Sequence, residues 1–327
     1  MRQIAFREAL REAMNEEMRR DEKVFLMGEE VAEYNGAYKV SQGMLEEFGA
    51  KRVIDTPIAE LGFTGIAVGA AQNGLRPIVE YMTWNFATLA LDQILNTASK
   101  MLAMSGGQIG CPIVLRGANG SAGQLGAQHS TAFESMYANI PGLKVISVSN
   151  PYDAKGLLKS AIRDNDPVIF MESEVMYGEK GDVPEEEYLI PIGKAKVVRE
   201  GTDVTIVSFN KMMKVAIGAA EELQKENISA DVIDLRTIRP MDWQTILTSV
   251  KKTNRLVIVE EQWPFASISS EIAYRIQKEG FDYLDAPVRR ITSTDTPMHY
   301  APNLVAAYLP DVPRTVNLVK EVMYLKK

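Results

Sequence analysis

Short runs of apolar, β-prone residues alternate along this chain with longer stretches of helical periodicity, and this alternation limits the possible folds more than any other feature. In the first half, strands are predicted at 77–81, 112–116, 144–148 and 168–171. Strands that alternate with helices at this spacing are typical of a mostly parallel sheet covered on both faces. We therefore predict a doubly wound α/β domain, in which ligands bind at the carboxyl ends of the strands.

The N-terminal segment predicts an amphipathic helix. Its apolar residues recur at four-residue steps, with Arg and Glu between them: Phe6, Leu10, Met14 and Met18. This period places the four side chains on one face, which would pack on the sheet. Further helices are predicted at 65–73, at 85–104, near Phe133 and at 153–163.

The alternation stops at an acidic segment that contains Gly and Pro, GEKGDVPEEEYLIPIGKAKVVRE. A second βαβ pattern follows it, with strands at 204–209, 231–235 and 256–260 and helices at 213–225 and 243–251. We predict a first domain over 1–178, a linker over 179–200 and a second α/β domain over 201–327.

The composition excludes several classes of function. The chain carries 36 basic and 43 acidic residues, a net charge of -7, without a basic stripe, so nucleic acid is not expected as a partner. No apolar run approaches the roughly 20 residues that cross a bilayer, and the charged N-terminus does not resemble a signal peptide. We expect no membrane contact and a cytoplasmic location, with a mature organellar protein as the alternative. One Cys and two His leave no side-chain cluster for zinc or iron.

Glu60 is the first candidate for chemistry. It lies among Ile58, Ala59, Leu61 and Phe63, just before a helix rich in Gly and Ala. If these neighbours bury the carboxyl group, desolvation raises its pKa, and the group could hold and transfer a proton near neutral pH. The alternative is an exposed turn residue, or a carboxylate that accepts hydrogen bonds from nearby backbone amides.

His129 is the second candidate, at the end of the Gly-rich loop GANGSAGQLGAQHS. The glycines allow the backbone to lie against a ligand, and imidazole is suited to proton transfer near pH 7. A structural loop histidine is the alternative. The loop contains neither GxxxxGK[ST] nor GxGxxG, so phosphate binding by this chain alone is weakly supported.

Other residues have weaker signals. Met82, Trp84 and Phe86 follow a predicted strand and could pack on a flat aromatic ligand, although core or interface positions are the usual alternative. Glu29 and Asp92 have surface or capping roles as their default interpretation.

Several long strings resemble one family of enzymes. They are VFLMGEEVAEYNGAYKVSQG, DTPIAELGFTGIAVGAA, RPIVEYMTWNFA, MSGGQ, IVLRGANGSAGQLGAQHS, AIRDNDPVIFMES and DLRTIRPMD. From about residue 2 to about residue 310, the chain resembles the β subunits of thiamine diphosphate-dependent 2-oxo acid dehydrogenase components, most closely those of pyruvate dehydrogenase. The resemblance implies a pyrimidine-binding domain followed by a transketolase C-terminal type of domain.

The resemblance also implies roles for individual residues. Glu60 matches the acid that hydrogen-bonds and protonates the pyrimidine ring of thiamine diphosphate, and Met82 and Phe86 match residues that pack on that ring. His129 matches a histidine that acts on the lipoyl group or the acyl intermediate. Other matches are a proton relay at Glu29 and Asp92, and a potassium site formed by main-chain carbonyls of Ile113, Ala161, Ile162, Asp164 and Asp166. The family reads HSQ where this chain has His129-Ser130-Thr131, and has Pro in place of His299.

One motif of thiamine enzymes is absent. The GDG string that helps to hold Mg²⁺ and the diphosphate does not occur. The resemblance therefore implies an α subunit that supplies this half of the site, in an α2β2 assembly that docks on a dihydrolipoyl acyltransferase core and acts on its lipoyl domain. The expected reaction is the decarboxylation of pyruvate and the reductive acetylation of the lipoyl group.

Three alternatives remain at this point. The first is a β subunit selective for branched-chain 2-oxo acids or acetoin. The second is a noncatalytic scaffold, which the presence of Glu60 and His129 disfavours. The third is a single-chain transketolase-like enzyme, which the missing GDG string disfavours.

Overall fold

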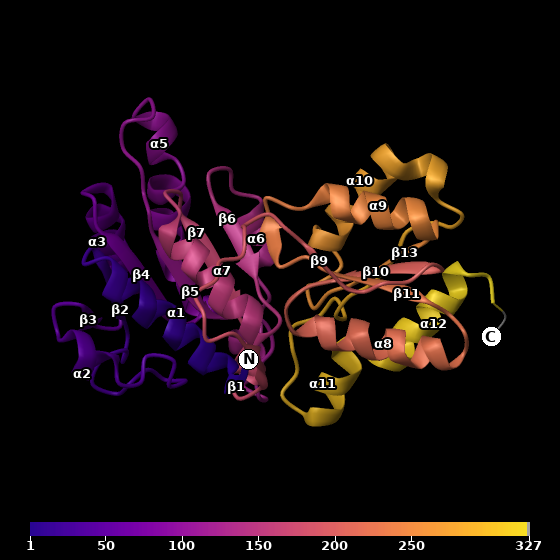
Figure 1. Ribbon diagram of the computed structural model, residues 1–327, viewed down its shortest axis with the longest axis horizontal. Coiled ribbons are helices and arrows are strands. Elements are labelled where there is room, and N and C mark those ends of the chain that lie inside the picture. The colour runs from indigo at the N-terminus through magenta and orange to yellow at the C-terminus, as the bar shows by residue number, and fades with distance from the viewer. Residues whose placement is uncertain (326–327) are drawn as a thin grey trace.

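The computed structural model describes residues 1–325, and over this range the chain forms two α/β lobes that lie side by side (Figure 1). The described strands form sheets of seven, five and two strands. The seven-stranded sheet belongs mainly to the first lobe, and the five-stranded sheet belongs to the second.

The large sheet has the order β12-β6-β7-β5-β4-β2-β3. All of its neighbouring strands are parallel except β12, which pairs antiparallel with β6. The predicted mostly parallel sheet is therefore confirmed. The strands are β2 (Val24–Gly28), β3 (Val53–Asp55), β4 (Arg76–Thr83), β5 (Val114–Ala118), β6 (Lys144–Ser147), β7 (Val168–Glu172) and β12 (Thr237–Arg239).

Helices connect these strands and cover the sheet. They are α1 (Phe6–Arg20), α2 (Met44–Phe48), α3 (Glu60–Gln72), α4 (Trp84–Ala87), α5 (Met101–Met104), α6 (Glu134–Ala138) and α7 (Pro151–Arg163), with the 3₁₀ turns η1 (Thr88–Ala90), η3 (Ala127–His129) and η4 (Glu174–Met176). The long helix predicted over 85–104 differs, because the described chain forms α4, η1, the π-helix η2 (Gln93–Ala98) and α5 in succession. Near this change the hydroxyl of Ser99 donates to the carbonyl of Leu95 at 2.8 Å, a contact that often bends helices.

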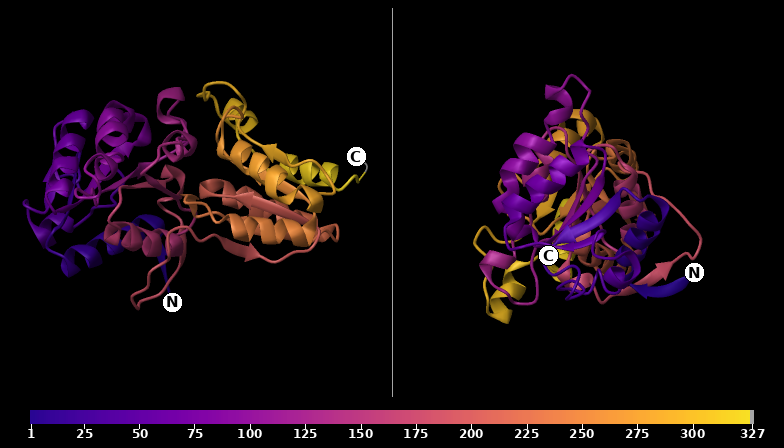
Figure 2. Two further views of the ribbon diagram at one scale, coloured as in Figure 1. Left: turned by 90° about the horizontal axis from the view of Figure 1, so that it is seen from above. Right: turned by 90° about the vertical axis from the view of Figure 1, so that its left-hand side faces the viewer.

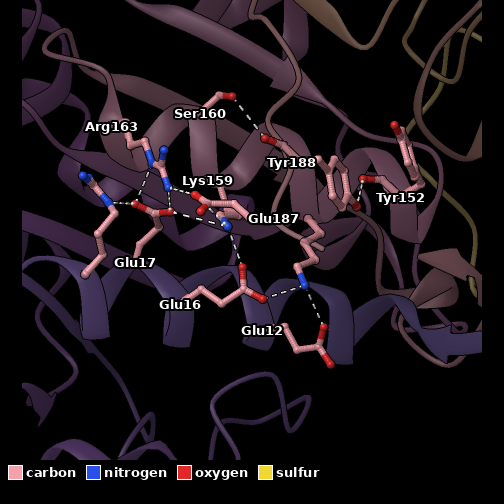
Figure 3. Close-up of polar contacts among 12 residues, drawn as sticks. Glu12, Glu16, Glu17, Tyr152, Lys159, Ser160, Arg163, Glu187 and Tyr188 are labelled. Carbon is pink, nitrogen blue, oxygen red and sulfur yellow. Dashed lines mark hydrogen bonds and ion pairs between the residues drawn. The ribbon is translucent and has the colours of Figure 1, made fainter. Parts of the chain in front are cut away.

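Helix α1 buries the face that its periodicity predicts. Phe6, Leu10, Met14 and Met18 are all at most 2% exposed. The helix also carries carboxylates that pair with cations of α7 (Figure 3). Glu16 lies 2.6 Å from Nζ of Lys155 and 2.5 Å from Nζ of Lys159, while the fully buried Glu17 accepts from Nη2 of Arg163 at 2.7 Å. Apolar packing and ion pairs therefore stabilise the contact between α1 and α7.

The segment predicted as a linker contains two short strands. β8 (Lys180–Val183) pairs antiparallel with β1 (Arg2–Ala5), and β9 (Lys196–Arg199) pairs antiparallel with β11 of the second sheet. Between them, Tyr188 stacks on Tyr152 with ring centroids 4.7 Å apart. The segment is thus bound to both lobes, and the domain boundaries drawn from the sequence stay a prediction.

The second lobe is a five-stranded sheet between two layers of helices, seen from above in the left view of Figure 2. Its order is β14-β13-β10-β11-β9. In Figure 1, α9 and α10 lie on one side of the sheet, and α8 and α12 lie on the other. The remaining elements are β10 (Val204–Ser208), β11 (Ala230–Asp234), β13 (Leu256–Val259), β14 (Arg289–Ile291), η5 (Asn210–Met212), η6 (Phe281–Tyr283), α8 (Met213–Lys225), α9 (Trp243–Thr253), α10 (Ile268–Gly280), α11 (Pro302–Tyr308) and α12 (Val312–Val322).

The two lobes share one apolar core. A single cluster of buried side chains includes Leu115 and Val145 of the first lobe and Phe209, Leu235 and Ile238 of the second. β12, which follows β11 in the chain, forms the edge of the first sheet. The second lobe therefore completes the first. Within residues 1–325, no helix is both long and apolar enough to cross a bilayer.

Candidate active site

Two acidic side chains meet at the carboxyl end of the first sheet. Glu29 directly follows β2, Glu60 is the first residue of α3, and they are 9% and 4% exposed. Burial raises the pKa of Glu29 to about 7, and the negative charge of Glu60 adds to this shift. Two carboxyls so close together cannot both ionise easily. The pair can therefore hold a proton near neutral pH and transfer it.

The cause of burial at Glu60 differs from the prediction. Among its chain neighbours, Ile58 is 85% and Leu61 is 50% exposed, so they do not cover the carboxyl, whereas Phe63 is buried. Glu60 instead turns inward at the start of α3, toward Glu29 and Tyr81, whose pKa its charge helps to raise. Packing between distant segments, rather than apolar neighbours in sequence, removes Glu60 from water.

A row of contacting aromatic side chains lies on the inner side of the acid pair. Tyr81 lies 5.8 Å from Phe63 and 5.6 Å from Trp84, and Trp84 lies 4.9 Å from Tyr137, measured between ring centroids. The hydroxyls of Tyr81 and Thr64 are 2.6 Å apart. Trp84 is fully buried, so its alternative interpretation as a core residue is confirmed.

Phe86 and His129 come together although 43 positions separate them in the sequence. Their rings meet edge to face, with centroids 5.2 Å apart and planes at 87°. Both side chains are half-buried, as is Met82 at the end of β4. Phe86 and Met82 therefore keep enough exposed surface to contact a ligand, and His129 lies at the same rim.

Asp92 is exposed at the start of the π-helix η2, where it accepts from Nδ2 of Asn96 at 2.7 Å. In this chain it does not lie in a buried channel with Glu29. Its assignment to a proton relay stays a prediction, and it requires that another protein surface cover Asp92.

Four of the five carbonyls predicted to bind potassium accept hydrogen bonds from donors of their own chain. Those of Ile162 and Asp164 accept from the guanidinium of Arg76, at 3.0 Å in the first case. Ile113 accepts from the amide of Val168 at 2.9 Å, and Ala161 accepts from that of Asp164 at 3.2 Å. The carboxylates of Asp164 and Asp166 pair with Lys144. Arg76 thus supplies a positive charge to two of the predicted carbonyls, those of Ile162 and Asp164. The described residues contain no group of three or more His, Cys, Asp or Glu that could hold a metal.

Sequence reasoning missed a buried polar cluster beneath the Gly-rich loop. Glu134 accepts from the hydroxyl of Ser147 at 3.0 Å and from Nε2 of Gln262 at 3.2 Å, and burial raises its pKa to about 7. Nearby, Lys211 pairs with Glu261 at 2.8 Å. Gln262 belongs to the second lobe and lies 128 positions from Glu134 in the sequence, so no local pattern could reveal this contact.

The surface around the acid pair is open and apolar. Several large side chains are at least 46% exposed there or on nearby elements of the first lobe: Ile58, Leu61, Ile66, Leu89 and Leu125. A cleft of about 1060 Å³ does exist between α6 and α9–α10, but none of the predicted site residues lines it. Exposed apolar surface of this kind marks an interface.

Comparisons with known proteins agree in family and fold. Residues 2–180 match the transketolase pyrimidine-binding domain, and residues 193–314 match the transketolase C-terminal domain. Relatives named pyruvate dehydrogenase E1 component subunit beta include one of Rickettsia bellii, 58% identical over 99% of this chain and 100% of its own length. Another, subunit beta-1 (mitochondrial) of Arabidopsis thaliana, is 53% identical over 100% of this chain and 91% of its own.

A solved structure has the same fold at lower identity. The chain titled "Split gene transketolase, inactive beta4 tetramer" aligns with a TM-score of 0.81 and 21% identity, over 99% of both chains. At this identity the match supports the two-lobed transketolase-like fold alone.

Proposed function

This chain belongs to the family of pyruvate dehydrogenase E1 component β subunits within the transketolase-like enzymes, and from that premise we propose that it supplies half of a thiamine diphosphate site. With an α subunit it would decarboxylate pyruvate and acetylate the lipoyl group of an acyltransferase. The observation that carries the proposal is the buried carboxyl pair Glu29 and Glu60, which opens on an exposed apolar face.

The residues present fit the aminopyrimidine end of the cofactor. Glu29 Oε1 is buried and has no hydrogen-bond partner among residues 1–325, so the acid pair can still take up a polar group. Glu60 would hold the ring nitrogen, and Met82 and Phe86 would pack on the ring. The bound cofactor would supply the electron sink for decarboxylation. The chain's own contribution is to orient the ring and to hold a proton at the carboxyl pair.

His129 would act at the rim of the same site. Its ring lies against Phe86 at 5.2 Å, so a group that reaches Phe86 also reaches the imidazole. We assign it to proton transfer with the lipoyl or acyl group. Asp92, exposed directly before η2, would join the proposed relay with Glu29 only where another subunit covers it.

The second half of the site belongs, in this proposal, to an α subunit. The chain has no GDG string, so Mg²⁺ and the diphosphate would be held mainly by the α subunit. The exposed apolar residues around α3 would be buried against that subunit in an α2β2 tetramer. The second lobe would dock on the dihydrolipoyl acyltransferase core. A potassium ion at the carbonyls predicted from the resemblance remains part of the proposal.

The relatives include bacterial proteins and plant proteins named as mitochondrial. The cytoplasmic location and the preference for pyruvate over branched-chain 2-oxo acids or acetoin therefore stay predictions. Substrate contacts would be shared with the α subunit.

The test is dye-linked decarboxylation of pyruvate with thiamine diphosphate and Mg²⁺. We expect activity from this chain paired with its α subunit, and none from the chain alone. Glu60→Gln in that pair should lower the rate by about 10²-fold or more, because it removes one carboxyl group of the acid pair. Glu33→Gln, on the exposed loop after β2, is the matched control and should keep the wild-type rate.

Three outcomes would contradict the proposal. Activity of the lone chain would refute the split site. Equal rates with branched-chain 2-oxo acids would refute the preference for pyruvate. A pair that is inert with every 2-oxo acid tested would favour a noncatalytic scaffold.

A further inference from the structure

We propose that Lys211 and Glu261 of the second lobe are positioning residues that fix the Gly-rich loop and thereby set the place of His129. The proposal rests on the proposed function only for the role of His129. The two residues lie just beyond the carboxyl ends of the neighbouring parallel strands β10 and β13. They are 6% and 8% exposed, and Nζ of Lys211 lies 2.8 Å from Oε1 of Glu261.

Both charged groups bind the same residue of the first lobe. The amide of Ser121 donates to Oε1 of Glu261 at 2.5 Å. Nζ of Lys211 donates to the carbonyl of Ser121 at 2.6 Å and to its hydroxyl at 2.5 Å. The ammonium group has three donors, and Ser121 with Glu261 provides three acceptors. The ion pair thus holds Ser121 by its N–H, its C=O and its side chain.

Gly120 permits this close approach. Its φ is +75°, a left-handed conformation that favours glycine, and a Cβ atom there would clash with the carboxylate of Glu261. The backbone at 120–121 is therefore shaped to receive a side chain from the other lobe.

The loop is closed immediately beyond this contact. The amide of Gly120 donates to the carbonyl of Thr131 at 3.1 Å, and Oδ1 of Asn119 accepts from the amide of Phe133 at 2.9 Å. His129 lies between these two ends, whereas residues 123–125 at the tip are exposed. Apart from its ring contact with Phe86 and the turn at Gly126, the position of His129 depends on the base of the loop, and one side of that base is held by Lys211 and Glu261.

If the ion pair of Lys211 and Glu261 only joined the lobes, its loss would have a different effect. Its loss would lower stability and reduce every activity together. Loss of a positioning device should instead free the loop and impair the step that uses His129, because a displacement of about 1 Å can cost about 10²-fold in rate.

The test uses Lys211→Met in the assembled enzyme. We expect hydrogen exchange of the amides at 121–129 to accelerate by about tenfold or more. We also expect the ratio of lipoyl-domain acetylation to dye-linked decarboxylation to fall by about tenfold or more, as in His129→Ala. In the double variant Lys211→Met/His129→Ala, the ratio should be no lower than in His129→Ala alone, because both changes act on one step.

Two controls separate positioning from folding. Lys214→Met, on the next turn and half-exposed in a surface pair with Glu179, should change neither readout. Lys211→Arg should restore part of the ratio. If Lys211→Met does not fold, Gly120→Ala provides a second test, because its Cβ atom would displace the carboxylate of Glu261 from the loop while both charged residues stay in the chain.

The proposal would be overturned by unchanged exchange in the loop, or by rates that fall together with the melting temperature at a constant ratio. If the wild-type assembly decarboxylates no 2-oxo acid, the proposed function fails, but the exchange experiment still decides whether Lys211 and Glu261 hold the loop.

Discussion

The burial and the pKa of individual carboxyl groups in this chain depend on residues that lie far away in the sequence. Glu60 becomes buried because it turns toward Glu29, 31 positions earlier, although Ile58 and Leu61 beside it face solvent. Glu29 in turn retains its proton to about pH 7 because it is buried against a second acid. The proposed proton chemistry is thus a property of a pair, and neither residue provides it alone.

Glu134 allows a prediction about stability and pH. Burial raises its pKa from 4.5 to about 7. A raised folded-state pKa means that its contribution is present below about pH 4.5 and is lost as the pH rises through 7. At 1.36 kcal/mol per pKa unit, the loss is about 3 kcal/mol. Glu134→Gln stays neutral, so it should match the wild type at pH 5 and be more stable at pH 8.5.

Urea unfolding at both pH values measures this difference. Glu46→Gln, on the exposed face of α2, serves as the control and should show no such change with pH. A stability difference between Glu134→Gln and the wild type that is the same at pH 5 and pH 8.5 would contradict the assignment.

At the scale of elements, ion pairs that involve buried side chains link α1 and α7. The two sequences give no sign that these charged residues are buried. Glu17 is fully buried and interacts with Arg163, Arg20 and Lys159. Lys155 and Lys159 have side chains only 1% and 2% exposed. Charged residues on the periodic helix α1 thus face a second helix rather than water.

Glu17→Ala should destabilise the chain by about 3 kcal/mol, because it leaves the cations of α7 without their buried partner. Thermal or urea unfolding measures the loss. Glu22→Ala, in the exposed turn after α1, should change stability by no more than about 0.5 kcal/mol. Equal effects of the two substitutions would show that the network contributes little.

At the scale of the whole molecule, the two lobes are not independent. They share an apolar cluster, and β12 of the second half completes the first sheet. Their contact also includes Arg236, whose Nη2 donates to Asp153 at 2.6 Å, and the pair of Lys211 and Glu261.

We therefore expect the full chain to unfold in one cooperative transition. A fragment of residues 1–192 would lose β12 and the partners of its buried face, so it should not fold alone. Calorimetry and circular dichroism of both chains test this. A fragment with native-like ellipticity and a cooperative transition of its own would show that the first lobe is autonomous.

The sequence by itself determined the class of fold, because hydrophobic periodicity depends on each residue's near neighbours. The apolar face of α1 and the parallel sheet were predicted correctly in this way. The same information could not reveal the breaks in the helix predicted at 85–104 or the strands β8 and β9 in the predicted linker, since these depend on what each segment packs against.

The candidate site was predicted only in part. Long motifs indicated Glu60, His129 and Phe86 as candidates, which stay predictions. The tertiary structure decided that Phe86 lies against His129 and that Glu29 shares the burial of Glu60. The hydrogen bonds of Lys211 and Glu261 to Ser121 could not be predicted from the sequence. Hydrogen bonds and desolvation act over a few ångströms in space, and only the folded chain brings residues 140 positions apart within that range.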